Sequence, residues 1–176
     1  MTAPAADRRL INRVHAVWKK AAGTGHPRRS QIDPRDYGSD WANCLLIDLD
    51  PVHARSRFSH VGDNLRDPTW PTFDRQSVAE CLEGSLLGLV TKHIPRLVVK
   101  KKALSFGGSA VHNEGDILYR TILLPLGESH EQMDGILAAV GYRDVSVAQE
   151  IPLAEGLRGD AATRHAAGLN GQARAG

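Results

Sequence analysis

The clearest pattern of apolar positions lies in residues 116–127, DILYRTILLPLG. Apolar side chains occupy both alternating sets of positions: Leu118, Ile122 and Leu124 in one set, and Ile117, Tyr119 and Leu123 in the other. Because side chains alternate along a strand, both faces of this strand need cover, which predicts the central strand of a layered sheet. Pro125 has no N–H to donate, so we expect the strand to end there.

Apolar residues recur at helical spacing in residues 7–22. This pattern predicts an amphipathic helix, which Gly23 and Gly25 would end. The side chains predicted to be buried are Leu10, Val14, Val17 and Trp18. The stripe fits two arrangements: packing on the chain's own sheet, or packing on the same stripe of a second copy in a homodimer.

Two further strands are predicted in the first half of the chain. Residues 23–40 are rich in Gly, Pro and charge, so we expect a connector with little regular structure. The apolar run 44–49 and the stretch 56–62 then predict two strands paired as a hairpin.

The second half of the chain predicts one long helix and a second hairpin. Residues 75–93 place apolar side chains on one broad face, which predicts a helix covering the inner face of the sheet. Residues 97–106 predict a strand that pairs with 116–127. Residues 133–142 fit a short helix or a last strand, and periodicity alone leaves both open.

This order of elements contains no repeated strand-helix-strand unit. It predicts an α+β fold: one antiparallel sheet with an amphipathic helix at the N-terminus and helices on the inner face. We expect residues 1–42 to form the helix and connector, residues 43–145 the sheet domain, and residues 146–176 a disordered tail rich in Gly, Ala and Arg.

Composition and charge narrow the class of protein. The chain has 176 residues, 41% hydrophobic and 24% charged, which is typical of one globular domain. Its net charge of +2 gives no support for nucleic-acid binding. Apolar runs are too short for a membrane span or a signal peptide, so we expect a cytoplasmic protein without membrane association. Cys44 and Cys81 lie in apolar runs and are expected to be buried rather than paired.

Sequence signatures of enzymes are incomplete here. The stretch 107–111 lacks the last glycine of a nucleophile elbow, and 23–28 lacks the third glycine of a dinucleotide loop. We therefore expect no catalysis, while an uncharacterised small-molecule enzyme stays a remote alternative. Asp48 and Asp50 have a spacing that could hold Mg²⁺, but acidic residues before a proline more commonly form turns.

A basic run, Lys100, Lys101 and Lys102, lies in the strand predicted at 97–106. Such a run suits an anionic partner, but on a strand it is more typical of a solvated edge that prevents association between sheets.

Several short motifs, together with the element order, resemble a PAS domain. The resemblance is to the divergent single-PAS family of bacterial regulators formerly known as a domain of unknown function, and it covers about residues 8–142. The matching stretches are Trp18 near the end of the first helix, 30–34 (SQIDP), 59–63 (SHVGD), 123–126 (LLPL) and 133–139 (MDGILAA). The serine at 59 and the proline-rich 67–71 depart from the family pattern.

The resemblance implies a stand-alone sensory or adaptor module in bacterial signal transduction, without its own output domain. Its partners would be a signalling protein, such as a kinase or regulator, and a small-molecule effector, and no cofactor is expected. A haem-binding PAS sensor is the alternative, with His93 or His60 as candidate ligands. The flavin-binding type requires an Asn-Cys-Arg-Phe string, which the neighbours of Cys81 do not form.

A PAS fold places a ligand between the inner face of the sheet and the helix covering it. The residues we expect to line this space are Phe58, Leu86, Val90, Leu104 and Leu118, with His60 and Tyr119 as polar groups. The alternative is that these side chains fill the interior, since protein cores are close-packed.

Overall fold

A computed structural model of the chain describes residues 6–66, 75–129 and 132–145. Helix α1 (Ala6–Ala22) is followed by short helical segments and the strands β1 (Cys44–Asp48) and β2 (Arg57–Val61). The short segments around these strands are η1 (Arg29–Gln31), α2 (Pro34–Tyr37), η2 (Gly38–Asn43), η3 (His53–Arg55) and η4 (Asp63–Leu65). The second half contains η5 (Val78–Glu80), α3 (Leu86–Thr91), α4 (Ile94–Lys100), β3 (Leu104–His112), β4 (Gly115–Gly127) and β5 (Met133–Asp144).

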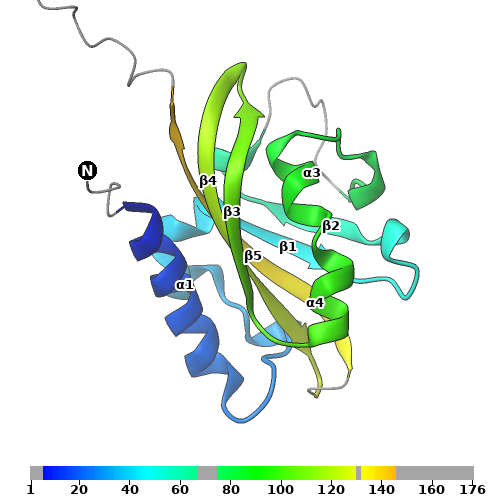
Figure 1. Ribbon diagram of the computed structural model, residues 1–176. Coiled ribbons are helices and arrows are strands. Elements are labelled where there is room, and N and C mark those ends of the chain that lie inside the picture. Colours follow the sequence, from blue (N-terminus) through cyan, green and yellow to red (C-terminus); the bar gives the residue numbers. More distant parts are fainter. Residues whose placement is uncertain (1–5, 67–74, 130–131, 146–176) are drawn as a thin grey trace, which may run out of the picture.

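The strands form one antiparallel sheet in the order β2-β1-β5-β4-β3. Both predicted hairpins, β1 with β2 and β3 with β4, are confirmed. Helix α1 lies on one face of the sheet, here called the outer face, and α3 and α4 lie on the inner face (Figure 1). The predicted α+β fold, one antiparallel sheet with an N-terminal helix on one face and helices on the other, is therefore confirmed.

The centre of the sheet is β5, and the prediction that 116–127 is the central strand is wrong. Residues 133–142, which were compatible with either a helix or a strand, form β5 between β1 and β4. The run Ile136, Leu137, Ala138, Ala139 and Val140 has no exposed surface. A strand covered on both faces loses the alternation of apolar and polar residues that identifies a half-buried strand.

Strand β4 continues past Pro125 to Gly127, which corrects the predicted strand end. Beyond Leu123, which pairs with Leu104, β4 has a strand neighbour only on the β5 side. Proline is tolerated there because its missing N–H leaves no ladder hydrogen bond unmade. The Pro125 carbonyl accepts a buried hydrogen bond of 3.1 Å from the indole Nε1 of Trp18, which ties α1 to the sheet.

The outer face is covered by α1 in a continuous apolar layer. Val14 is 1% exposed, Ile11 and Trp18 are buried, and Leu10 and Val17 are partly buried against them. Their partners on the sheet are Leu46, Ile122, Leu124, Leu126, Leu137 and Ala139. Of the two predicted arrangements, the structure shows the stripe on the chain's own sheet. At about 1.5–3 kcal/mol for each fully buried aliphatic side chain, this layer makes a large contribution to stability.

The inner face is covered by short helices, and the prediction of one helix over 75–93 is wrong. The chain has positive φ at Arg75 (57°) and Gly84 (86°), which a continuous helix does not allow. Ser77 caps η5 through the N–H of Ala79, and Ser85 caps α3 through that of Gly88. Serine side chains favour helix starts, so each cap begins a new segment.

The strand predicted over 97–106 begins only at Leu104. Residues up to Lys100 belong to α4, where Pro95 lies in the first turn, a position at which proline is favourable. Ile94 and Leu97 project inward and are fully buried, so tertiary burial favours the helix over the local strand propensity of Val98 and Val99.

Within the described ranges, no helix combines the length and apolar character needed to cross a bilayer. The predicted disordered tail, 146–176, and the proline-rich 67–71 lie outside the described residues.

Candidate functional site

Most of the predicted pocket residues meet in the inner core. Phe58, Leu86, Val90, Leu104 and Tyr119 belong to one buried cluster, with β2, α3, β3 and β4 each contributing. The structure thus brings together five of the seven predicted residues. They pack among the other side chains of the inner layer, as the filled-core alternative expects.

Leu118 and His60 lie on the other side of the sheet, so their predicted place in the inner pocket is wrong. Leu118 is 37% exposed and alternates with Ile117 and Tyr119, which face inward. In β2, Phe58 pairs with Ile47 and His60 with Leu46, so Ser59 is an extra residue in a bulge. The bulge reverses the alternation, and the His60 ring stacks on Trp41, whose side chain packs in the outer layer.

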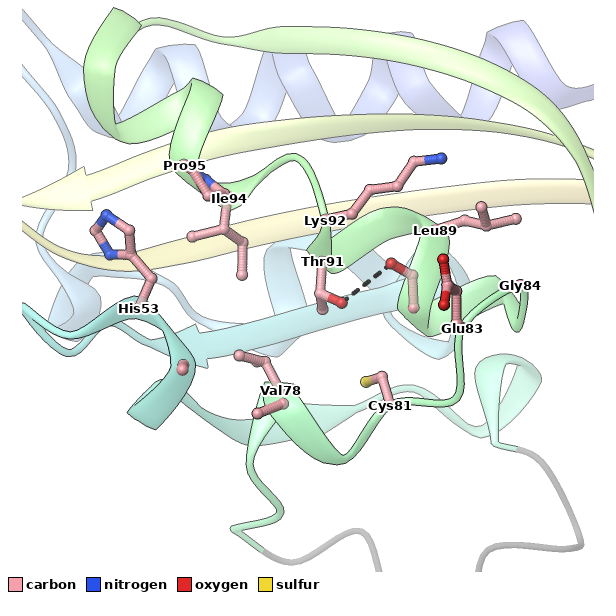
Figure 2. A pocket seen from close by; sticks show the side chains of 13 residues that line it. His53, Val78, Cys81, Glu83, Gly84, Leu89, Thr91, Lys92, Ile94 and Pro95 are labelled. Atoms are coloured by element: carbon pink, nitrogen blue, oxygen red, sulfur yellow. Dashed lines mark hydrogen bonds between the residues drawn. The ribbon is translucent and has the colours of Figure 1, made fainter.

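A cavity of about 430 Å³ lies beside the inner core, between η3, η5 and the α3–α4 pair (Figure 2). Its lining is mainly apolar, with a few polar groups. The lining residues are His53, Ala54, Val78, Ala79, Cys81, Glu83, Gly84, Gly88, Leu89, Thr91, Lys92, Ile94 and Pro95. None of the predicted pocket residues is among them. The volume falls within the range of about 300–1,000 Å³ usual for small-molecule sites.

The broken inner helix creates this cavity. The turn at Gly84 leads the chain from η5 into α3, and the backbone of Leu82 lies against Gly88, where a Cβ would clash with the Leu82 carbonyl oxygen. A single helix over 75–93 would run straight through this region. The signals that could have revealed the break were Gly84 followed by Ser85, and Pro95 as a helix start.

Cys81 and Thr91 form the polar part of the cavity wall. The Thr91 hydroxyl donates to the Leu87 carbonyl at 2.9 Å. It also lies 3.3 Å from the Gly88 carbonyl, the contact drawn as a dashed line in Figure 2. Burial raises the pKa of the Cys81 thiol to about 11, and a hydrogen bond with Thr91 opposes part of this shift. The thiol is therefore neutral at physiological pH, which makes it a weak nucleophile.

His53 stands at the far end of the cavity from Glu83 (Figure 2). Its Nδ1 is buried and has no hydrogen-bond partner among the described residues. Glu83 and Lys92 are exposed, and Figure 2 shows the Lys92 amine directed away from Val78 and Cys81. The charged side chains of the lining therefore lie at the rim of the cavity.

The candidate haem ligands do not line this cavity. His93 lies between α3 and α4 and packs on Phe106, with ring centroids 3.8 Å apart. His60 faces the outer layer, so the sheet separates the two rings. Burial lowers the pKa of both imidazoles, which keeps them neutral near pH 7.

Asp48 and Asp50 have local partners. Asp48 accepts a hydrogen bond from the Ser59 hydroxyl, and Asp50 accepts one from the Val52 N–H, which closes a turn. The Asp50 contact agrees with the turn-forming role expected from the sequence, whereas the Asp48 contact links β1 to β2. Among the described residues, no group of three or more acidic, histidine or cysteine side chains has the arrangement of a metal site.

Comparisons with known proteins give likenesses among solved structures but no sequence family. No protein-family model matches the chain, and no curated protein matches it. A solved structure described as the PAS domain from Bordetella pertussis BvgS is 12% identical, covers 60% of this chain and 78% of its own, and has a TM-score of 0.36. The α+β fold assignment rests on the strand order and the two helical layers described above.

Proposed function

We propose that this protein is a PAS-like sensory or adaptor module that binds a small effector and passes the signal to a partner protein. The observation that supports the proposal is the cavity between η3, η5 and α3–α4. It adjoins the inner core at Ile94, so an effector there would contact helices that also pack on the sheet. The partner would be a signalling protein such as a kinase or regulator.

The lining suggests the class of effector. Apolar walls with a few convergent polar groups suit a small, uncharged and mainly apolar molecule. Its polar group would bond to the Thr91 and Cys81 edge of the cavity. Glu83 and Lys92 are exposed, so a charged group would meet an opposite charge only at the solvated rim, where ion pairs contribute little.

The same chemistry favours binding over catalysis. The Cys81 thiol is held protonated, and His53 and Glu83 come from opposite ends of the cavity (Figure 2). An acid–base or nucleophilic pair requires its two groups within hydrogen-bond reach.

Ligand-observed NMR with a panel of neutral ring alcohols and lactones tests the proposal. Ala79 lines the cavity and is exposed, so Ala79→Trp fills the hollow without entering the packed core. Val99→Trp adds the same indole at an exposed position on α4 that is not part of the lining. We expect panel compounds to bind the wild type and Val99→Trp, and to lose at least about tenfold in affinity for Ala79→Trp.

Two results would contradict the effector site. One is equal binding to both tryptophan variants, and the other is no binding of any panel compound to the wild type. Stoichiometric iron and a Soret band in protein purified from cells supplied with haem would instead favour the alternative, a haem-binding sensor.

A further inference from the structure

The positive charge of the chain is concentrated in one acid-free segment. Residues 84–113 contain no Asp or Glu, while five of the chain's 22 Lys and Arg residues lie there: Lys92, Arg96, Lys100, Lys101 and Lys102. The rest of the chain has 17 basic against 20 acidic residues. A nearly neutral protein thus carries a local field of one sign, which is a feature of surfaces that steer charged partners.

The structure places much of this charge on one face of α4. Ile94 and Leu97 point into the core and are fully buried. Arg96, Val99 and Lys100 are exposed, and positions three and four apart are neighbours on a helix surface. This set and the exposed Lys102, which follows the helix, are called the α4 basic face below.

The α4 basic face is unpartnered within the part of the chain that the structure describes. Among the described residues, the arginines that form ion pairs are Arg13, Arg35 and Arg66. Arg96, Lys100 and Lys102 form none of these ion pairs. Val99 is 83% exposed between the cations. The sequence predicted that Lys100 lies on a strand edge, where its charge would prevent association between sheets. In the structure Lys100 is the last residue of helix α4, so this role does not apply.

We propose that the α4 basic face is the docking surface for an acidic surface on a partner protein, with Val99 as the apolar contact among the charges. Protein interfaces combine apolar contacts with a polar rim, and complementary charge sets orientation and association rate. The inference rests on the proposed adaptor function, and it places the partner next to the effector. Pro95, in the first turn of α4, lines the effector cavity (Figure 2).

Two other anionic partners fit the same face less well. A helix of seven residues that exposes one valine has too little apolar surface to lie in a membrane interface. The large apolar side chains exposed in the described ranges are Val52, Leu82, Val99, Val111 and Leu118. None of them is aromatic, which disfavours stacking on single-stranded nucleic acid.

The test measures binding of the full chain to three probes by fluorescence anisotropy or co-sedimentation. The probes are an amphipathic helical peptide of about 20 residues with Glu and Leu on one face, vesicles of phosphatidylcholine with phosphatidylserine, and a DNA duplex. We expect the peptide to bind most tightly. Arg96→Glu/Lys100→Glu should weaken peptide binding at least about tenfold, and Val99→Ser about threefold.

Arg9→Glu/Lys20→Glu is the matched control, because it makes the same change in net charge at exposed positions on α1. It should change peptide affinity by less than about twofold. Arg96→Gln/Lys100→Gln is the second variant, because Glu at the C-terminal end of a helix opposes the helix dipole. The glutamine pair should show the same direction of effect, with an unchanged melting temperature.

Several outcomes would overturn the docking surface. They are equal losses in the control and α4 variants, no peptide binding by the wild type, and tighter binding of vesicles or DNA that depends on Arg96 and Lys100. The experiment is independent of the effector, since it is run without panel compounds. Ala79→Trp should therefore keep peptide affinity even though it loses the panel compounds.

Discussion

The two faces of the sheet are covered in opposite ways. On the outer face, one 17-residue helix, α1, lays a continuous apolar stripe on β4 and β5, and Trp18 is hydrogen-bonded to the Pro125 carbonyl. On the inner face, η5, α3 and α4 are short pieces that begin at caps and turns. The outer layer is filled by its helix, whereas the inner layer has a packed core and, beside it, a cavity.

We interpret the outer layer as the main source of stability and the inner layer as the carrier of the candidate binding sites. A long helix with its stripe buried gains stability from every turn, and it leaves little room for a ligand. Short helices joined by turns also bury apolar side chains, such as Leu86 of α3 and Leu97 of α4, and their junctions can line a hollow and present charge. Binding sites are commonly carried by such irregular segments on a rigid scaffold.

The largest effect should come from breaking the outer layer. Val14 is 1% exposed, so Val14→Asp would bury a carboxylate among apolar side chains and should lower the free energy of unfolding by about 3 kcal/mol or more. Urea denaturation measures this change. Ala16→Asp, at an exposed position on the same helix, should cost less than about 1 kcal/mol, the loss of helix propensity alone. A folded Val14→Asp protein with wild-type stability would contradict the role of α1.

An intermediate effect should distinguish the inner core from the cavity next to it. Leu86 is 1% exposed in the inner core, so Leu86→Trp overpacks this cluster and should destabilise the protein by about 1–3 kcal/mol. Ala79→Trp, at the cavity, should cost less than about 0.5 kcal/mol. Thermal melting of the pair gives the comparison. Equal losses would mean that the cavity wall is as tightly packed as the core.

The smallest effect concerns pH. Burial lowers the pKa of His60, His93 and His15, so the unfolded chain binds more protons than the folded one as pH falls through the ordinary histidine range. Stability should therefore be full above about pH 7 and should decrease toward pH 5. Melting temperatures from pH 8 to 5 measure this slope. His60→Gln should flatten it, while a slope equal to wild type would contradict burial of a neutral His60.

The fold class and most of its strands could be predicted from the sequence. The helix at 7–22, both hairpins and the covering of both faces follow from spacing that is strong over whole elements. Local patterns are sufficient to predict these elements, because a long amphipathic helix or an alternating strand can bury its apolar side in only one way.

The elements that the sequence misplaced are those where two local signals compete. Gly84, Ser85 and Pro95 interrupt an otherwise helical apolar pattern, and whether they kink one helix or start new ones depends on what each piece buries. The cavity exists because these three residues start new helical segments. The cavity residues were therefore missed, although Val78 and Cys81 lie within the range 75–93 predicted as the covering helix.

What the sequence alone determined is the set of elements that must bury an apolar face: α1, the two hairpins and the α+β class. Only the tertiary structure decided that β5 is central, that Ser59 forms a bulge turning His60 outward, and that the inner helix breaks around a hollow. The physical reason is the sequence separation of the residues that interact. Periodicity records which side of an element is buried, whereas strand order, bulge position and cavities arise from pairings between residues far apart in the chain.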